Sequence, residues 1–210
     1  MSKLKNYNSV EGKVFKEFFQ DHRIDPYIAL IVESYIYKKV IEYYDDTEQI
    51  KKKYMIIYGK KEGLYQEWNK NGQKYQEFTY KNNKREGLYQ GWNENGQKII
   101  ECIYKENKLE GMYQYWYVNG QKWIEWNYKD DKKEGLCKNW HPNGQQGLQI
   151  NYKDNVRQGI CEFWFENGQK KWEFNYKDGK RNGEIKNWNE QGELTLHEIY
   201  HEDNLIEKIL

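Results

Sequence analysis

Two histidines near the end of the chain, His197 and His201, lie four residues apart. On a helix this spacing lets both rings bind one metal ion. On a β-strand four residues span about 13 Å, which is too far for one shared ion. His22 and His141 have no partner nearby in the sequence that would complete a site. We therefore predict no metal centre.

The three cysteines, Cys102, Cys137 and Cys161, are too few and too irregularly spaced for a disulfide framework. None lies in the short Cys or His spacing that is typical of zinc sites. Cys137 and Cys161 are 24 residues apart and occupy the same place in successive copies of a repeat. We expect their Cα atoms to lie about 10 Å apart, beyond the reach of a disulfide, and interpret both as small apolar fillers.

No segment has the features of an active site. A nucleophile elbow, a phosphate-binding glycine loop and a cluster of carboxylates with histidine are all missing from the sequence. Glutamates do recur, but the repeat itself explains their spacing, so they are poor candidates for acid–base pairs. We predict that the protein is not an enzyme and uses no cofactor.

The elements that must position any functional residue come from the repeat. The stretch "EGLYQEWNKNGQKYQEFTYKNNKR" at residues 62–85 is followed at once by "EGLYQGWNENGQKIIECIYKENKL". Tryptophan recurs every 24 residues, at Trp68, Trp92, Trp116, Trp140, Trp164 and Trp188. A period held over six copies without insertion is typical of a solenoid-type array, in which each unit packs on its neighbours.

Each unit predicts two strands, such as Leu64–Asn69 and Lys74–Lys81, because aromatic residues lie between turn formers. Between them we expect a three-residue loop, Lys70–Gly72, with Gly72 in the left-handed conformation. Gly63 and its equivalents are natural sites for bulges in the following connection. The fold class is therefore mainly β: one elongated, single-sheet, antiparallel β-hairpin repeat, about 10 Å per unit.

The core is expected on the face that carries the even-numbered apolar positions. Leu64, Trp68, Phe78 and Tyr80 share this parity, and an odd-numbered loop would bring them to one side of the sheet. The predicted core comprises the six tryptophans named above and a tyrosine column: Tyr80, Tyr104, Tyr128, Tyr152 and Tyr176.

The chain divides into four segments. Residues 1–37 form an N-terminal cap, 38–61 a degenerate first repeat, 62–205 six full repeats, and 206–210 a closing strand. Within the cap, Asp25 and Pro26 are typical of a helix start, whereas the β-branched and Tyr content suits a strand. Both a helical and a mixed cap remain open.

Composition excludes several function classes. The chain has 210 residues, 20 Tyr, 9 Trp and a formal net charge of +1. Near-neutral charge predicts no strong nucleic-acid field and makes binding to an anionic membrane unlikely on electrostatic grounds. No signal peptide or transmembrane run is visible, so we expect a cytoplasmic protein.

Aromatic residues also occur on the odd-numbered face, which we expect to be open to solvent. Exposed aromatics beside polar residues often mark interaction sites. The predicted partner-binding stripe contains Tyr65, Tyr89, Tyr113, Tyr115, Trp123 and Phe163. An equally weighted alternative is that residues 1–37 fold over this stripe.

The pattern G-x-x-x-x-W-x-x-x-G-x(7)-Y, with its "NGQ" turn and "YKDGKRNG" connector, resembles the MORN repeat. It is similar to the variant found in bacterial proteins, some labelled antitoxins, and in large DNA viruses. The resemblance covers residues 62–205 well and 38–61 weakly. It implies hairpin arrays that act as scaffolds, oligomerisation modules or protein-binding surfaces, and it supplies no catalytic residues. Lipid-headgroup binding is a further property proposed for some members.

We therefore expect a non-enzymatic scaffold for protein–protein interaction or assembly. The partner is expected to be another protein, and two copies can also pair through sheet edges as a homodimer. One alternative is an antitoxin-like protein that neutralises a partner enzyme. A second is binding to lipid headgroups at a membrane surface or to single-stranded nucleic acid through aromatic side chains.

Overall fold

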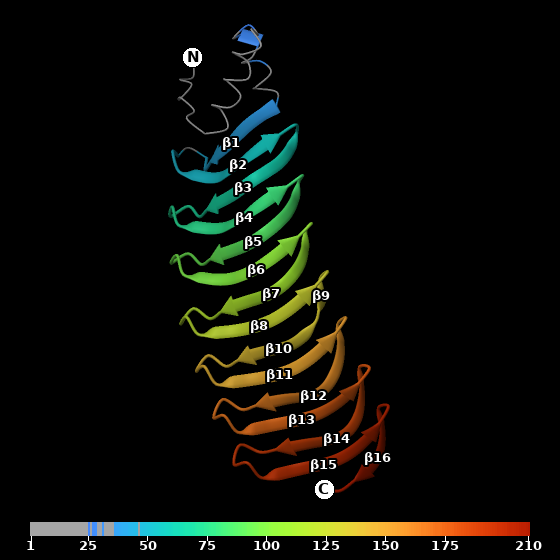
Figure 1. Cartoon of the computed structure of the whole chain (residues 1–210). Helices are drawn as coiled ribbons and strands as arrows, with labels where there is room; N and C mark the ends of the chain where they lie inside the picture. The colour runs from blue at the N-terminus through green and yellow to red at the C-terminus, as the bar shows by residue number, and fades with distance from the viewer. Residues whose placement is uncertain (1–24, 26, 29–30, 32–35, 46) are drawn as a thin grey trace.

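The computed structural model describes residues 25, 27–28, 31, 36–45 and 47–210. These residues form one 16-stranded antiparallel sheet in which successive strands are neighbours, with the short strand β9 attached to β8. Figure 1 shows a single elongated layer of curved strands, stacked in chain order from β1 to β16. The predicted fold class is thus confirmed.

The strand bounds follow the 24-residue period. They are β1 (Tyr37–Tyr43), β2 (Ile50–Ile57), β3 (Lys60–Trp68), β4 (Lys74–Lys81), β5 (Lys84–Trp92), β6 (Lys98–Lys105), β7 (Lys108–Trp116), β8 (Lys122–Lys129), β9 (Lys132–Lys133), β10 (Gly135–Trp140), β11 (Gln146–Lys153), β12 (Val156–Trp164), β13 (Lys170–Lys177), β14 (Lys180–Trp188), β15 (Leu194–His201) and β16 (Asn204–Lys208).

The loop between β3 and β4 forms as the sequence predicts. The Asn69 N–H donates to the Gln73 carbonyl at 2.8 Å, and the Gly72 N–H donates to the Asn69 carbonyl at 2.9 Å. Gly72 has a φ of 82°, which favours glycine because it has no Cβ. Three residues therefore separate the hydrogen-bonded pair Asn69 and Gln73.

A bulge in the second strand then changes the parity. Trp68 pairs with Lys74, but Glu67 pairs with Gln76, so Tyr75 has no partner of its own. Beyond this point Tyr65 pairs with Phe78, and directly paired residues point to the same face. The expectation that Leu64 and Phe78 share a face is therefore wrong. One unpaired residue per hairpin is its physical cause.

The opposite connection is a two-residue turn followed by a bulge at glycine. Asn82 and Asn83 have φ values of 50° and 66° between the paired residues Lys81 and Lys84, which defines a type I′ geometry. In the next such connection, Cys102 pairs with Tyr113 and Tyr104 with Leu109, so two extra residues loop out of β7 around Gly111. The predicted glycine bulge is confirmed, and because two residues are added it does not alter the parity.

The core is a single row of side chains that runs across the strands; we name it the buried row. Its members are Tyr54, Tyr65, Phe78, Tyr89, Cys102, Tyr113, Trp126, Cys137, Ile150, Cys161, Phe174 and Ile185. Seven of them expose 6% or less of their surface. Rings in the row stack face to face, as between Tyr65 and Phe78, whose centroids lie 4.7 Å apart. Each of the first five full repeats adds two members and the sixth adds Ile185, so the row lengthens with the array.

Cations and tyrosines on the same face cover this row. The Lys61 ammonium lies 4.9 Å from the Tyr54 ring centroid and 5.2 Å from that of Tyr80. The Arg85 guanidinium lies 5.1 Å from the Phe78 ring centroid. Such contacts combine ring burial with cation–π attraction. Among the described residues, a one-layer sheet thereby buries a core without a second layer.

The predicted cap and first repeat are described only in part. Asp25 Oδ1 accepts a hydrogen bond from the Tyr27 N–H at 2.7 Å, which is N-cap geometry. The rest of the predicted helical or mixed cap falls on residues 1–24, 26, 29–30 and 32–35, outside the described residues. β1 and β2 pair antiparallel and add a hairpin before the first full repeat.

Candidate functional site

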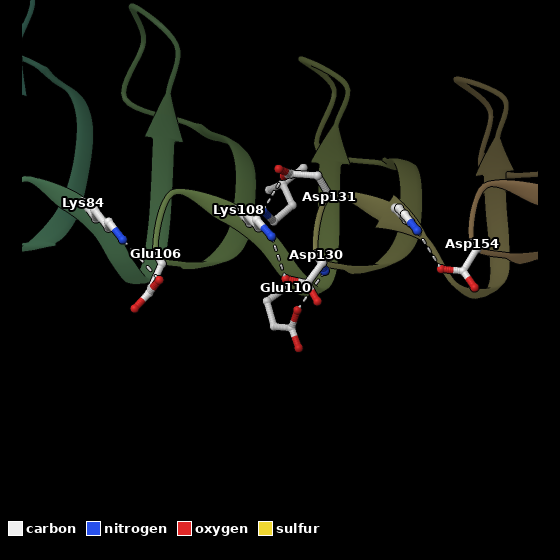
Figure 2. A network of polar contacts seen from close by, with 9 residues as sticks. Lys84, Glu106, Lys108, Glu110, Asp130, Asp131 and Asp154 are labelled. Atoms are coloured by element: carbon white, nitrogen blue, oxygen red, sulfur yellow. Dashed lines mark hydrogen bonds and ion pairs between the residues drawn. The ribbon is translucent and has the colours of Figure 1, made fainter.

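The two-residue turns form one edge of the sheet, which we name the turn edge. Figure 2 shows its polar contacts: the Leu109 N–H donates to Asp131 Oδ1 at 2.6 Å, and the Asp130 N–H donates to Glu110 Oε2 at 3.0 Å. Lys108 Nζ lies 3.1 Å from Asp130 Oδ1. Side chains of one turn thus satisfy backbone groups of the neighbouring turn, in both directions along the array. The recurring Glu-Gly and Asn or Asp residues have a structural use here.

The glycine loops form the opposite edge, which we name the loop edge. Asn143 Oδ1 accepts a hydrogen bond from the Gln145 N–H at 3.0 Å, and its Nδ2 donates to the Glu166 carbonyl of the next loop at 2.6 Å. The same link joins Asn71 to Glu94 and Asn167 to Glu190. The asparagine of four of the five "NGQ" loops therefore ties consecutive units together, and Asn95 is the exception.

The tryptophan column lies on the face opposite the buried row. Lys74 Nζ lies 2.6 Å from Glu77 Oε2 and 5.2 Å from the Trp92 ring centroid, and Glu77 pairs with Gln66 on that face. All six recurring tryptophans are half-buried. The tyrosine column, by contrast, packs against the buried row, as the 5.0 Å contact between the Phe78 and Tyr80 rings shows. The two columns expected to form one core therefore serve opposite faces.

The structure separates the residues of the predicted partner-binding stripe. Tyr65 exposes only 6% of its surface, and Tyr89 and Tyr113 are half-buried members of the buried row. Tyr115 and Phe163 are also half-buried, whereas Trp123 exposes 40%. Of the six, Trp123 is the residue most open to a partner.

Trp123 belongs to a different group of aromatic residues on the loop edge. We name Tyr117, Trp123, His141 and Phe165 the loop-edge strip. The Tyr117 and Trp123 rings stack with centroids 5.3 Å apart and an interplanar angle of 22°. Two of the rings are held by their polar tips: Tyr117 Oη donates to the Trp140 carbonyl at 2.9 Å, and His141 Nε2 donates to the Trp164 carbonyl at 2.9 Å. Their positions are therefore fixed before any partner arrives.

A surface hollow of about 510 Å³ continues the strip toward the C-terminal units. Its lining comprises His141, Trp164, Phe165, Glu166, Asn167, Lys171 and Glu190. The Lys171 ammonium lies 5.1 Å from the Phe165 ring centroid. Burial and the nearby Glu166 carboxylate raise the pKa of the Tyr117 phenol. The hollow thus combines aromatic rings with two exposed carboxylates and one ammonium group.

Sequence reasoning missed three residues of this strip although a signal was present. The position after the recurring tryptophan is asparagine in units one, two and six, at Asn69, Asn93 and Asn189. It is Tyr117, His141 and Phe165 in the three units between. This break lies outside the Gly, Trp and Tyr positions that define the repeat. A run of exceptions inside a strict period indicates a local requirement.

A metal site and a membrane-spanning helix each require specific features of the described residues. Within residues 36–45 and 47–210 and the few described before them, no group of three or more His, Cys, Asp or Glu residues could hold a metal ion. His197 and His201 are separated along β15, as expected for a strand. In the same part of the chain, no helix is long and apolar enough to cross a membrane.

These features define a class: an open, single-layer β-hairpin repeat protein whose units are linked along both edges. The family described as MORN repeat variant matches at residues 61–82, 85–106 and 157–180. The resemblance to the MORN repeat is thus confirmed over these three segments. Such repeats are generally interaction or binding repeats.

Comparison with whole proteins adds little. None of the curated proteins compared matches the chain. One solved structure, described as "Crystal Structure of TarM", aligns with 68% of this chain at 10% identity and a TM-score of 0.29. The chain spans only 27% of that protein's length.

Proposed function

We propose that this chain is a non-enzymatic binding scaffold that presents its loop-edge strip to another protein. The carrying observation is the run of Tyr117, His141 and Phe165 beside the exposed Trp123, where the other units have asparagine. Clustered aromatic residues with accessible faces are typical of protein interaction sites. The remaining recurrent side chains already hold the units together, so they are less available for binding.

The rigidity of the array supports this proposal. Links between consecutive units at both edges fix the spacing of the strip, and fixed side chains lose little conformational entropy on binding. A partner that contacts several units gains from each of them. Pairing of two copies through sheet edges stays a separate prediction.

A photocrosslinking experiment tests the proposal. Val118 lies at a loop tip within the strip and exposes 66% of its surface, so a benzoylphenylalanine there should keep the fold. Lys70 is the equivalent tip in the first unit and provides the matched control. In extracts of the cells that make the protein, we expect one dominant protein adduct from Val118→benzoylphenylalanine and little from Lys70→benzoylphenylalanine.

Each other outcome has a defined meaning. Equal labelling at both tips, or no protein adduct at either, contradicts the proposal. An adduct with an enzyme whose activity falls on stoichiometric binding identifies the scaffold as a neutralising, antitoxin-like partner. Recovery of lipid or nucleic acid in place of protein rejects a polypeptide partner and supports the corresponding alternative.

A further inference from the structure

The spacing of the loop-edge strip restricts the shape of its partner. Equivalent residues of successive units are separated by two strands, which is about 9.6 Å at the usual strand spacing of about 4.8 Å. Tyr117, His141 and Phe165 occupy one equivalent position in three successive units. A linear partner lying along the array must therefore offer a side chain at nearly this interval.

Polyproline II conformation has this interval. It has three residues per turn and a rise of about 3.1 Å, so one side repeats every ~9.3 Å. A β-strand repeats one face about every 6.7 Å. An α-helix needs seven residues, or about 10.5 Å, and its mismatch over three units is about three times that of polyproline II. Proline-rich segments also favour grooves lined by aromatic rings.

The charges of the hollow indicate what flanks the proline-rich part. Glu166 and Glu190 are exposed, and neither carboxylate forms an ion pair with the described residues. Lys171 already rests on the Phe165 ring, which shows that this aromatic surface accepts a cation. Two carboxylates and one ammonium group give the hollow an excess of negative charge, which favours an incoming basic side chain.

We propose that the loop-edge strip binds a proline-rich segment in polyproline II conformation, with a basic residue placed over the hollow beside Glu166 and Glu190. This inference rests on the proposed function and names the chemistry of its partner. Prolines or leucines at every third position lie against Tyr117, His141 and Phe165. The Trp123 ring, from β8 between β7 and β10, stacks on Tyr117 and adds a further aromatic surface to the strip.

A peptide titration tests the proposal with the full-length chain. The probe is the labelled peptide Arg-Pro-Leu-Pro-Pro-Leu-Pro-Pro-Leu-Pro-Arg, followed by fluorescence anisotropy. We expect saturable binding that weakens at least about tenfold in Tyr117→Asn/Phe165→Asn, the loss typical of removing two aromatic contacts. Asparagine is what other units carry at this position, so the variant should fold. Circular dichroism checks this.

A charge variant provides a second, independent measurement. Glu166→Gln/Glu190→Gln should weaken the arginine probe but leave a probe with glutamine in place of both arginines unchanged. Glu94→Gln is the matched control, because Glu94 holds the same place in the second unit, away from the strip. It should bind as the unaltered chain does. Added salt should reduce the difference between the two probes.

Several results would overturn this inference. They are no saturable binding, binding that the asparagine variant leaves unchanged, and equal affinity for a probe whose prolines are replaced by alanine. A preference for a heptad helical peptide would reject polyproline II. If the peptide fails while Val118→benzoylphenylalanine still captures a protein, only this inference is lost; if both fail, the proposed function is lost as well.

Discussion

At the scale of single residues, most recurrent side chains satisfy backbone groups of a neighbouring unit. Asn143 bridges its own loop and the next one, and Glu110 accepts a backbone N–H from the following turn. In a one-layer sheet these groups have no second layer to satisfy them. The residues that recur in every unit are therefore those that set the spacing between units. The proposed binding residues are those that depart from the repeat.

Asn143→Ala tests this assignment. The substitution removes a 2.6 Å bond to the Glu166 carbonyl and a 3.0 Å bond from the Gln145 N–H. We expect the free energy of unfolding to fall by about 1–2 kcal/mol, as for loss of such hydrogen bonds. Asn95→Ala is the control, because the Asn95 side chain forms no such link in the described part of the chain. Urea denaturation of both variants measures the difference, and equal losses would reject the role of the link.

The buried thiols give a second prediction at this scale. Burial raises the pKa of the Cys102 and Cys161 thiols to about 11, from 9.0. Two pKa units correspond to about 100-fold less thiolate near neutral pH. At pH 8 we expect Ellman's reagent to label these thiols far more slowly in the folded chain than in urea. Rapid labelling of the native chain would show that the buried row opens readily.

Buried tyrosines make the stability of the fold depend on pH in the alkaline range. Burial raises the pKa of Tyr89 and Tyr128 to about 12. Groups whose folded pKa is raised stabilise the fold below their unfolded pKa and lose that contribution as pH rises through the folded value. We expect the urea midpoint to be level near pH 8 and to fall between about pH 9 and 12. A midpoint that stays constant over this range would contradict the burial of these groups.

At the scale of elements, the sequence predicted the strands, the Gly72 loop and the glycine bulges, but not the face that is buried. The missing information is the unpaired residue, which is Tyr75 in the first unit. This position reads Tyr75, Ile99, Trp123, Gly147, Lys171 and Thr195, with no common size, charge or backbone preference. A bulge without a residue signature leaves parity undetermined. The sequence pattern also did not predict the loop-edge strip, because its residues differ from those that recur in the other units.

Two single-residue deletions test the parity argument. Deletion of Tyr75 removes the bulge but keeps Glu67 opposite Gln76 and Tyr65 opposite Phe78. Deletion of Glu77 keeps the bulge but moves Phe78, which is 3% exposed, to the other face. Exposing one such ring costs about 1.5–3 kcal/mol, more than the lost surface ion pair with Lys74, which is worth at most ~1 kcal/mol. Comparable destabilisation in both variants, measured by urea denaturation, would contradict the register.

At the scale of the whole molecule, each unit of the described array packs mainly on the units beside it. Ordering a unit costs about 1–2 kcal/mol per residue in backbone entropy, and each unit adds at most two members to the buried row. Stability must therefore come from interfaces between units, as in other repeat proteins. Removing a complete unit should shorten the sheet without changing its register, because the 24-residue period is kept across the new seam.

Two whole-unit deletions separate the fold from binding. Deleting residues 87–110 joins Glu86 to Gly111, and deleting 135–158 joins Glu134 to Gly159, so both seams keep the Glu-Gly step. Each variant should unfold cooperatively at a lower urea midpoint, and X-ray scattering should show a sheet about 10 Å shorter.

The first deletion leaves Tyr117, His141 and Phe165 in successive units and should bind the proline-rich probe as before. The second removes His141 and should weaken binding severalfold, because one of three aromatic contacts is lost. Equal binding by both variants would place the peptide site outside the strip, whereas failure of both to fold would show that the 24-residue unit is not the unit of stability.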